Sequence, residues 1–132
     1  TALLFLDLDK FKEVNDQFGH ETGDKLLQEV GSRLIRCVRS GDTVSRLGGD
    51  EFVIALPEIA RLEDVEATAE KIIRILSEPM PIAGHLLKVS ASIGIAISKP
   101  EAQFDATELL ARADVAMYAA KKAGRNRYCF SG

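Results

Sequence analysis

Four acidic residues stand at two places in this sequence where carboxylates can act together on a metal ion. Asp7 and Asp9 end the first apolar run, and Asp50 and Glu51 directly follow a pair of glycines. If the strands that flank the glycines neighbour the apolar run, these carboxylates converge at one edge of a sheet. Clustered carboxylates repel one another and need a compensating cation. Mg²⁺ suits such a place because it prefers oxygen ligands and shares the phosphates of a substrate.

Each of these residues also has a purely structural interpretation. Asp9 precedes a predicted helix, and its position favours a helix N-cap over a catalytic role. Asp50 and Glu51 taken alone are compatible with a solvent-exposed turn. Gly48-Gly49 is typical of a tight hairpin turn, although glycines also let a backbone approach a phosphate or a base closely. Alone, this short motif is weak evidence for a site.

Apolar periodicity and turn residues predict the elements that must position these carboxylates. A continuously apolar first segment indicates a buried strand, and two further strands flank the glycine pair. Thr22 is the N-cap expected for the second helix, and a turn is expected at Gly84-His85. Strands are predicted at residues 2–8, 43–47, 52–56, 80–83, 86–97 and 127–130, and helices at 10–18, 23–38, 65–76 and 109–120.

This order of elements predicts an α+β fold with a central, mainly antiparallel five-stranded sheet flanked by helices. It corresponds to a ferredoxin-like core with an added β-hairpin. The chain has 132 residues, which fit a single domain with a real hydrophobic core. Because it starts inside an apolar strand, we expect residues 1–132 to be one domain cut from a longer protein, without its N-terminal segment.

The net charge and the composition of the chain limit the kinds of molecule that it is expected to bind. The formal net charge is −3, which argues against broad binding to nucleic acid or to a membrane surface. A nucleotide substrate stays compatible, because a few cations in one cleft suffice for it. Cys37 and Cys129 are far apart and are expected to be free thiols. With no apolar run of membrane-spanning length, the expected location of this domain is the cytoplasm, whether or not its parent protein is membrane-anchored.

The sequence around the acidic residues resembles the GGDEF family of diguanylate cyclases over nearly the whole chain. The matching segments occur in order and at the family's spacing: residues 7–16, 18–20, 23–24, 46–52, 92–94, 113–114 and 121–126. The stretch from Met117 to Tyr128 also resembles GGDEF domains fused to an EAL phosphodiesterase domain. The resemblance implies a palm-like sheet, as in nucleotide cyclases, and the condensation of two GTP molecules into cyclic di-GMP and two pyrophosphates.

The resemblance implies metal and catalytic roles for the acidic residues. Asp7 and Asp50 match the family's metal-binding carboxylates, and Leu8 would add its backbone carbonyl. Glu51 matches a position that either binds the metal or activates the 3′-hydroxyl, and these two roles stay open. The expected cofactor is Mg²⁺ or Mn²⁺, two ions per GTP.

The resemblance also implies which residues bind the nucleotide. Asn15 and Asp24 match the guanine readers; a carboxylate accepts the N1–H and the exocyclic amine of guanine, a donor pair that adenine lacks. Lys12, Lys121 and Arg125 match the cations that bind phosphate. Singly, each has a plainer interpretation, such as an exposed helix residue or a charge that suits a helix end.

An Arg-x-x-Asp motif, Arg39 to Asp42, matches the family's product-inhibition site for cyclic di-GMP, although ordinary turn chemistry explains the same residues. Catalysis in this family requires a homodimer, because each domain holds one GTP. The segment that family members carry before the first strand, with a Leu-Thr-Gly-Leu-like motif, has no counterpart here.

Two other functions are compatible with these residues. One is a catalytically silent module that binds GTP or cyclic di-GMP and regulates a fused phosphodiesterase. The other is a different nucleotide cyclase or a polymerase palm, which predicts another base preference and no Arg-x-x-Asp site.

Overall fold

The central strand of the fold is the apolar N-terminal segment, β1 (Ala2–Asp9). The computed structural model describes residues 1–98 and 105–131. β1 pairs antiparallel with β3 (Glu51–Leu56) on one side and with β6 (Ser90–Ile97) on the other. Because helices cover both faces of the sheet, nearly every side chain of β1 is buried, which explains its uninterrupted apolar sequence.

The sheet has five strands in the order β2-β3-β1-β6-β7. β2 (Thr43–Gly48) and β7 (Arg127–Phe130) form its edges. The β6–β7 pair is parallel and the other pairs are antiparallel. The prediction of an α+β fold with a mainly antiparallel five-stranded sheet is confirmed, and the sheet is mixed because α4 crosses over between β6 and β7.

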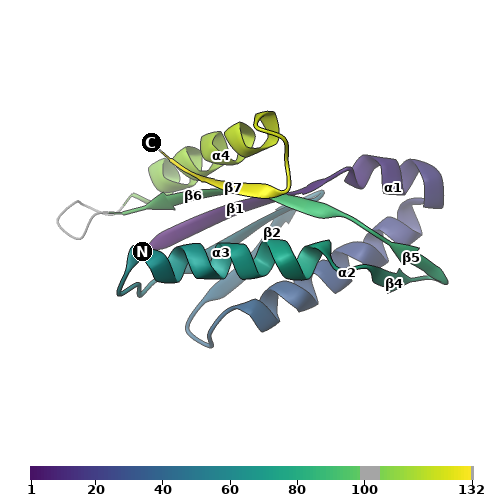
Figure 1. Cartoon of the computed structure of the whole chain (residues 1–132), viewed down its shortest axis with the longest axis horizontal. Helices are drawn as coiled ribbons and strands as arrows, with labels where there is room; N and C mark the ends of the chain where they lie inside the picture. The colour runs from purple at the N-terminus through teal and green to yellow at the C-terminus, as the bar shows by residue number, and fades with distance from the viewer. Residues whose placement is uncertain (99–104, 132) are drawn as a thin grey trace.

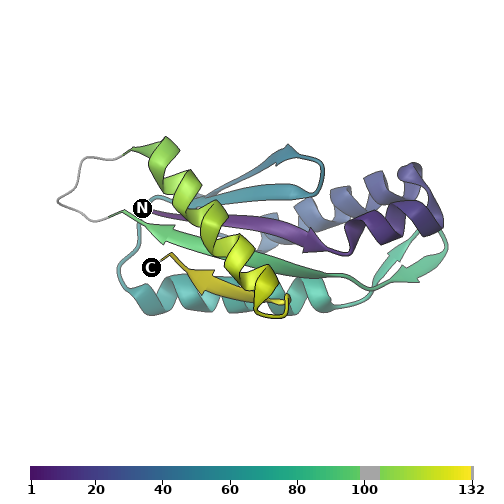
Figure 2. The same cartoon turned by 90° about the horizontal axis from the view of Figure 1, so that it is seen from above.

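Helices cover both faces of the sheet, as Figures 1 and 2 show. α2 (His20–Cys37) and α3 (Leu62–Ser77) pack on one face, over side chains such as Leu4 and Leu6. α4 (Ala106–Lys122) crosses the other face, over Leu3 and Phe5. The alternation of β1 therefore divides its side chains between two clusters, and Asp7 and Asp9 lie on the α4 face.

α1 (Phe11–Phe18) and a small hairpin extend beyond the sheet at one end, on the right in Figure 1. The hairpin is formed by β4 (Met80–Ile82) and β5 (His85–Leu87), and the His85 ring lies 4.6 Å from that of Phe18. The single strand predicted at 86–97 was therefore wrong: β5 and β6 are separate strands in different sheets. The turn lies at Ala83-Gly84, where both residues have positive φ, one residue before the predicted turn.

Two helix starts also differ from the prediction. α1 begins at Phe11 after Lys10, which has φ 65°, and no side chain caps it. Asp9 is therefore not its N-cap. α2 begins at His20, and Thr22 is a buried residue inside the helix. None of the helices in the described part of the chain has the length and apolar composition needed to cross a bilayer.

Candidate functional site

The structure brings three of the four acidic residues together, where β1 ends beside the β2–β3 turn. Asp7 is paired with Glu51 across the two strands. The Leu8 amide donates a hydrogen bond to the Asp50 carbonyl at 3.2 Å, which extends the pairing into the turn. The predicted metal ligands Asp7, Leu8 and Asp50 are therefore neighbours.

Asp7, Asp50 and Glu51 form what is called the acidic cluster below. Within it, the surroundings of Asp7 disfavour its negative charge. Burial, followed by the neighbouring Asp50 carboxyl, raises the pKa of Asp7 to about 6, and Lys121 opposes this shift. The Lys121 ammonium lies 3.1 Å from Asp7 Oδ2, whereas Asp7 Oδ1 is buried without a hydrogen-bond partner. A buried acceptor without a partner is costly and indicates that a donor or a cation belongs there.

These residues fit a magnesium ion that shares its coordination with a substrate. Asp7 and Asp50 supply hard oxygen ligands, and a cation would relieve both their repulsion and the unpaired Oδ1. Within the described ranges 1–98 and 105–131, no group of three or more His, Cys, Asp or Glu side chains is arranged to hold a metal. Mg²⁺ usually completes such a shell with waters and phosphate oxygens rather than with further protein ligands.

The turn that carries Asp50 follows Gly48, the last residue of β2, and contains Gly49. Gly49 has φ 51°, a left-handed conformation that favours glycine. Gly48 pairs with Glu51, so the turn residues are Gly49 and Asp50, one position later than the predicted Gly48-Gly49 turn. The Arg46 side chain donates to the Gly49 carbonyl at 3.0 Å and braces the turn.

The phosphate-binding cations predicted from the sequence lie on two elements. Lys121 lies in the last turn of α4 and reaches the acidic cluster. Arg125 lies in the exposed turn after α4 and has φ 63°. Lys12 is exposed on α1, the helix that directly follows β1 in the chain. No ion pair of Lys12 or Arg125 occurs among the residues that the structure describes.

The predicted guanine readers, Asn15 and Asp24, lie on the adjoining helices α1 and α2. Asn15 Oδ1 is buried without a partner, as Asp7 Oδ1 is. It lies against Gly23, where an added Cβ would overlap it. Asp24 is the next residue and is exposed. Gly23, directly before Asp24 in the chain, thus makes room for the Asn15 amide, a role that residue types alone did not reveal.

Arg39 and Asp42 lie apart from the acidic cluster, at the opposite end of the β2–β3 hairpin. Asp42 accepts a hydrogen bond from the Arg39 backbone amide at 2.9 Å, and its Oδ2 lies 3.6 Å from Arg39 Nε. The Arg39 guanidinium donates to the Glu58 carbonyl at 2.7 Å. The two residues of the motif are therefore neighbours, in the loop between α2 and β2.

Sequence reasoning missed the role of Asp9. Its carboxylate is 1% exposed and accepts hydrogen bonds from two serines of β6 and from a backbone amide beyond α4. Those partners lie more than 80 residues away in the chain, so local sequence carried no signal for them beyond the buried position on β1.

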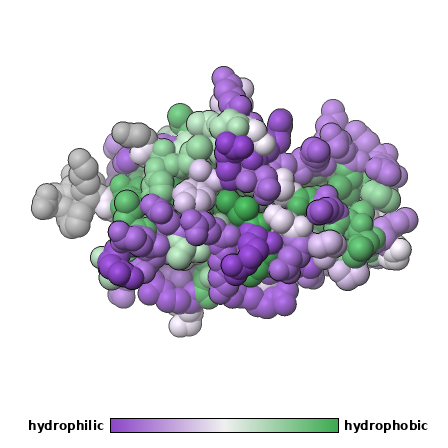
Figure 3. Space-filling view, viewed as in Figure 1, coloured by the Kyte–Doolittle hydropathy of each residue, from purple (hydrophilic) through white to green (hydrophobic). Residues whose placement is uncertain are grey.

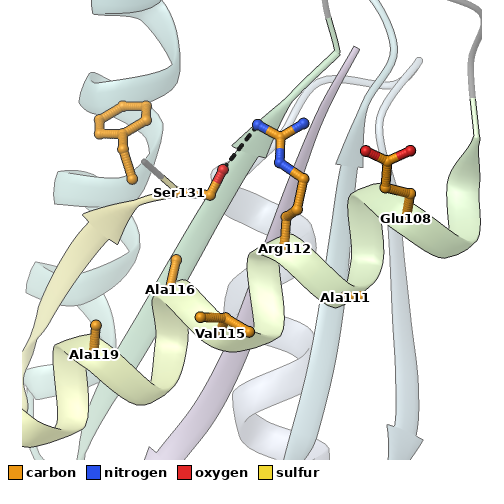
Figure 4. Close-up of a pocket in the computed structure, with 8 residues that line it drawn as sticks. Glu108, Ala111, Arg112, Val115, Ala116, Ala119 and Ser131 are labelled. Atoms are coloured by element: carbon orange, nitrogen blue, oxygen red, sulfur yellow. Dashed lines mark hydrogen bonds between the residues drawn. The ribbon is translucent and has the colours of Figure 1, made fainter.

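An apolar hollow of about 490 Å³ lies elsewhere, between the outer side of α4 and β7. Figure 3 shows apolar surface over these two elements. Figure 4 shows Val115 and Ala119 lining the hollow, and Arg112 donating to Ser131 across it at 2.9 Å. It contains none of the residues predicted to bind metal or nucleotide.

Comparison with known proteins agrees with this geometry. The family model for "Diguanylate cyclase, GGDEF domain" matches residues 1–127. The chain is 50% identical over 129 residues to the bifunctional diguanylate cyclase/cyclic di-GMP phosphodiesterase MucR of Pseudomonas aeruginosa, covering 98% of this chain and 18% of MucR. It is 39% identical to the cyclic di-GMP phosphodiesterase PdeR of Escherichia coli, covering 98% of this chain and 19% of PdeR. The chain thus spans less than a fifth of these relatives.

Solved structures are similar over almost the whole chain. The GGDEF domain of PA1120 from Pseudomonas aeruginosa superposes with a TM-score of 0.94 at 39% identity, covering 99% of this chain and 81% of that one. An EAL/GGDEF domain protein from M. capsulatus gives a TM-score of 0.91 at 43% identity, covering 99% and 84%. The matched family model and the shared fold show that this chain belongs to the GGDEF domain family of diguanylate cyclases.

Proposed function

We propose that this domain is a catalytically competent diguanylate cyclase that uses Mg²⁺ and works as a homodimer. The observation that carries the proposal is the acidic cluster at the end of β1. Asp7 keeps one buried carboxylate oxygen without a partner beside Asp50, and a lysine reaches the other oxygen. Such an arrangement fits a divalent cation with a triphosphate better than it fits a structural turn.

Different residues of the chain would bind the metal and the phosphates. Asp7, Asp50 and the Leu8 carbonyl would hold the metal, which supplies charge neutralisation at the triphosphate when bound. Lys12, Lys121 and Arg125 bind phosphate oxygens. Lys121 already lies at the cluster, beside the proposed metal ligand Asp7.

Residues on α1 and α2 would recognise the guanine base. Asp24 accepts hydrogen bonds from the N1–H and the exocyclic amine of guanine, and Asn15 lies against the preceding residue, Gly23. Adenine would leave the Asp24 carboxylate without hydrogen-bond donors. The free-energy cost of that unpaired carboxylate discriminates against ATP.

The reaction joins two half-sites. The 3′-oxygen of each GTP forms a bond to the α-phosphorus of the other, and the bond from that phosphorus to its β-phosphate bridging oxygen breaks. Two pyrophosphates leave, and each 3′-hydroxyl loses its proton. Glu51, which is paired with Asp7 across the strands, would either take part in this proton removal or assist the metal. A symmetric dimer supplies both half-sites at once.

A second function is favoured by one comparison. PdeR is named as a phosphodiesterase, although 39% identical to this chain. A domain of this family can therefore accompany degradation of cyclic di-GMP, and a silent regulatory module would bind nucleotide without turnover. Against this, the present sequence keeps Asp7, Asp50, Asn15 and Asp24 at their matching positions.

The deciding experiment is product analysis of the protein containing this domain, incubated with GTP and Mg²⁺ and separately with ATP. We expect cyclic di-GMP from GTP alone, and none after Asp50→Asn. The matched control is Asp64→Asn, an exposed aspartate at the start of α3 on the other face of the sheet, which should retain activity. Nucleotide binding without product in the wild type would favour the regulatory module.

A further inference from the structure

Asp9 holds together three segments that meet at the end of β1. Its Oδ2 accepts hydrogen bonds from the Ser90 hydroxyl at 2.6 Å and from the Asn126 backbone amide at 3.1 Å. Its Oδ1 accepts one from the Ser92 hydroxyl at 2.7 Å. With 1% of its surface exposed and both oxygens engaged by donors, this carboxylate has its hydrogen-bonding needs met by protein. It therefore differs from Asp7, whose Oδ1 has no partner.

The turn after α4, which Asp9 anchors, has an unfavourable backbone conformation. Gly124, Arg125 and Asn126 have φ values of 126°, 63° and 50°, so two consecutive non-glycine residues adopt the left-handed region. Such a conformation persists only where the surroundings over-determine it. The Arg125 amide donates to the Ala120 carbonyl at 3.0 Å, and the contact from Asp9 fixes the next amide along the chain.

This segment carries Arg125, one of the proposed phosphate-binding cations, and follows α4, which carries another, Lys121. Lys121 lies in the last turn of α4 and contacts Asp7, and Arg125 directly precedes the amide that Asp9 binds. Asp7 and Asp9 lie on the same face of β1, toward α4. β1, which supplies the metal ligand Asp7, thus also contacts the cation-bearing region at two places: Asp7 contacts Lys121, and Asp9 binds the Asn126 amide.

We propose that Asp9 is a positioning residue for the triphosphate-binding cations. It acts through the Asn126 amide, by holding the turn after α4 so that Arg125 and Lys121 face the acidic cluster. It does not act as a metal ligand. This inference rests on the proposed function, because it assumes that these cations bind GTP.

The chemistry of the contacts predicts different results for two substitutions. In Asp9→Asn, the amide oxygen can still accept from the Asn126 amide, and the amide nitrogen can donate to the Ser92 hydroxyl, which accepts as well as donates. In Asp9→Ala, all three contacts are lost. A metal ligand would behave differently, because an asparagine there lacks the charge that the cation needs.

Steady-state kinetics with GTP and Mg²⁺ should therefore separate the two roles. We expect Asp9→Asn to stay within about threefold of the wild-type KM, and Asp9→Ala to raise KM on the order of tenfold with a smaller effect on kcat. Loss of turnover in Asp9→Asn, as expected for Asp50→Asn, would overturn the proposal. So would a wild-type KM in Asp9→Ala.

A double-mutant cycle adds a readout that general destabilisation would not produce. If Asp9 acts through Arg125, the effects of Asp9→Ala and Arg125→Ala on GTP affinity should combine to less than their product. Effects that multiply fully would show that Asp9 does not act through Arg125. If Asp9→Ala fails to fold, the Ser90→Ala/Ser92→Ala variant, which removes two of the three donors, should raise KM in the same direction by a smaller factor.

Hydrogen exchange tests the anchor without any nucleotide. In the whole protein, peptides covering 121–127 should exchange faster in Asp9→Ala than in the wild type, while peptides from α3 stay unchanged. Unchanged exchange at 121–127 would overturn the proposal. If the wild type makes no product from GTP, the proposed function fails, and this measurement still decides whether Asp9 holds the turn.

Discussion

The Lys121 ammonium lies 3.1 Å from Oδ2 of Asp7, so a cation from α4 reaches one side of the acidic cluster before any metal binds. Both side chains are largely buried, at 22% and 15% exposure. Lys121 therefore partly neutralises a site whose carboxylates repel one another. A bound metal would replace Lys121 in this role, and the Lys121 ammonium could then bind a phosphate.

Replacing Lys121 should destabilise the metal-free domain and increase its response to Mg²⁺. We expect Lys121→Ala to lower the free energy of unfolding by about 1–2 kcal/mol without Mg²⁺, because a charged hydrogen bond to Asp7 is lost. Added Mg²⁺ should recover more stability in the variant than in the wild type. Thermal unfolding with and without Mg²⁺ measures both effects. Lys122→Ala is the control, since Lys122 lies 4.9 Å over the Tyr118 ring instead; equal Mg²⁺ responses in all three proteins would contradict the prediction.

Substituting Gly94 should displace α4 from the sheet. A Cβ at Gly94 would overlap the backbone of Ala113 and Met117 and lie 2.8 Å from the Ala116 carbonyl carbon, and backbone atoms cannot rotate away. We expect Gly94→Ala to cost about 1–3 kcal/mol by overpacking, measured by chemical denaturation. Gly41→Ala is the control, because a Cβ added there would meet nothing within 4 Å among the described residues. A Gly94→Ala protein as stable as the control would show that α4 does not press on the sheet.

Much of the fold was predictable because local patterns agree with the tertiary structure. The apolar run of β1 and the helical spacing in α3 and α4 each reflect burial in the final fold. The strand predicted at 86–97 failed because β-branched and apolar residues continue across Lys88 and Val89, where the chain leaves the hairpin for the main sheet. Nothing local marks that change of sheet.

The acidic cluster was predictable for a related reason. Asp7 and Asp50 each follow a recognisable strand or turn signal, and antiparallel pairing of β1 with β3 brings them together. Asp9 was not predictable, since its N-cap interpretation satisfied every local rule. Its actual partners, Ser90, Ser92 and the Asn126 amide, come close only when β6 and the turn after α4 assemble on β1.

Filling the space at Gly23 should disturb guanine recognition. An alanine Cβ there would overlap Asn15 Oδ1 and lie 3.0 Å from its Cγ, so the Asn15 amide must move from its present position. We expect Gly23→Ala to weaken GTP binding on the order of tenfold and to reduce discrimination against ATP. Gly31→Ala on the same helix is the control, because its nearest contact would be Phe52 at 3.9 Å. Competition binding of GTP and ATP measures both, and unchanged selectivity would place base reading elsewhere.

Removing the Arg39 side chain should abolish feedback by cyclic di-GMP while leaving the initial rate nearly intact. Arg39 lies in the loop before Thr43, at the opposite end of the β2–β3 hairpin from the Gly49-Asp50 turn. Its side chain is 72% exposed, although the guanidinium donates to the Glu58 carbonyl. It is therefore accessible to a dinucleotide without touching the GTP phosphates.

Inhibition from this distance requires that product bind an unproductive arrangement of the two domains better than the productive one. An arginine can stack on guanine and pair with a phosphate at the same time, whereas a lysine supplies only the charge. Titrating cyclic di-GMP against initial rates should therefore show inhibition in the wild type, weakened inhibition in Arg39→Lys and none in Arg39→Ala. Arg36→Ala, which removes an α2 cation that pairs with Glu29, should be inhibited like the wild type. Equal inhibition constants for Arg39→Ala and the wild type would leave Arg39 and Asp42 as a brace between α2 and β2, because their mutual contacts suffice for that role.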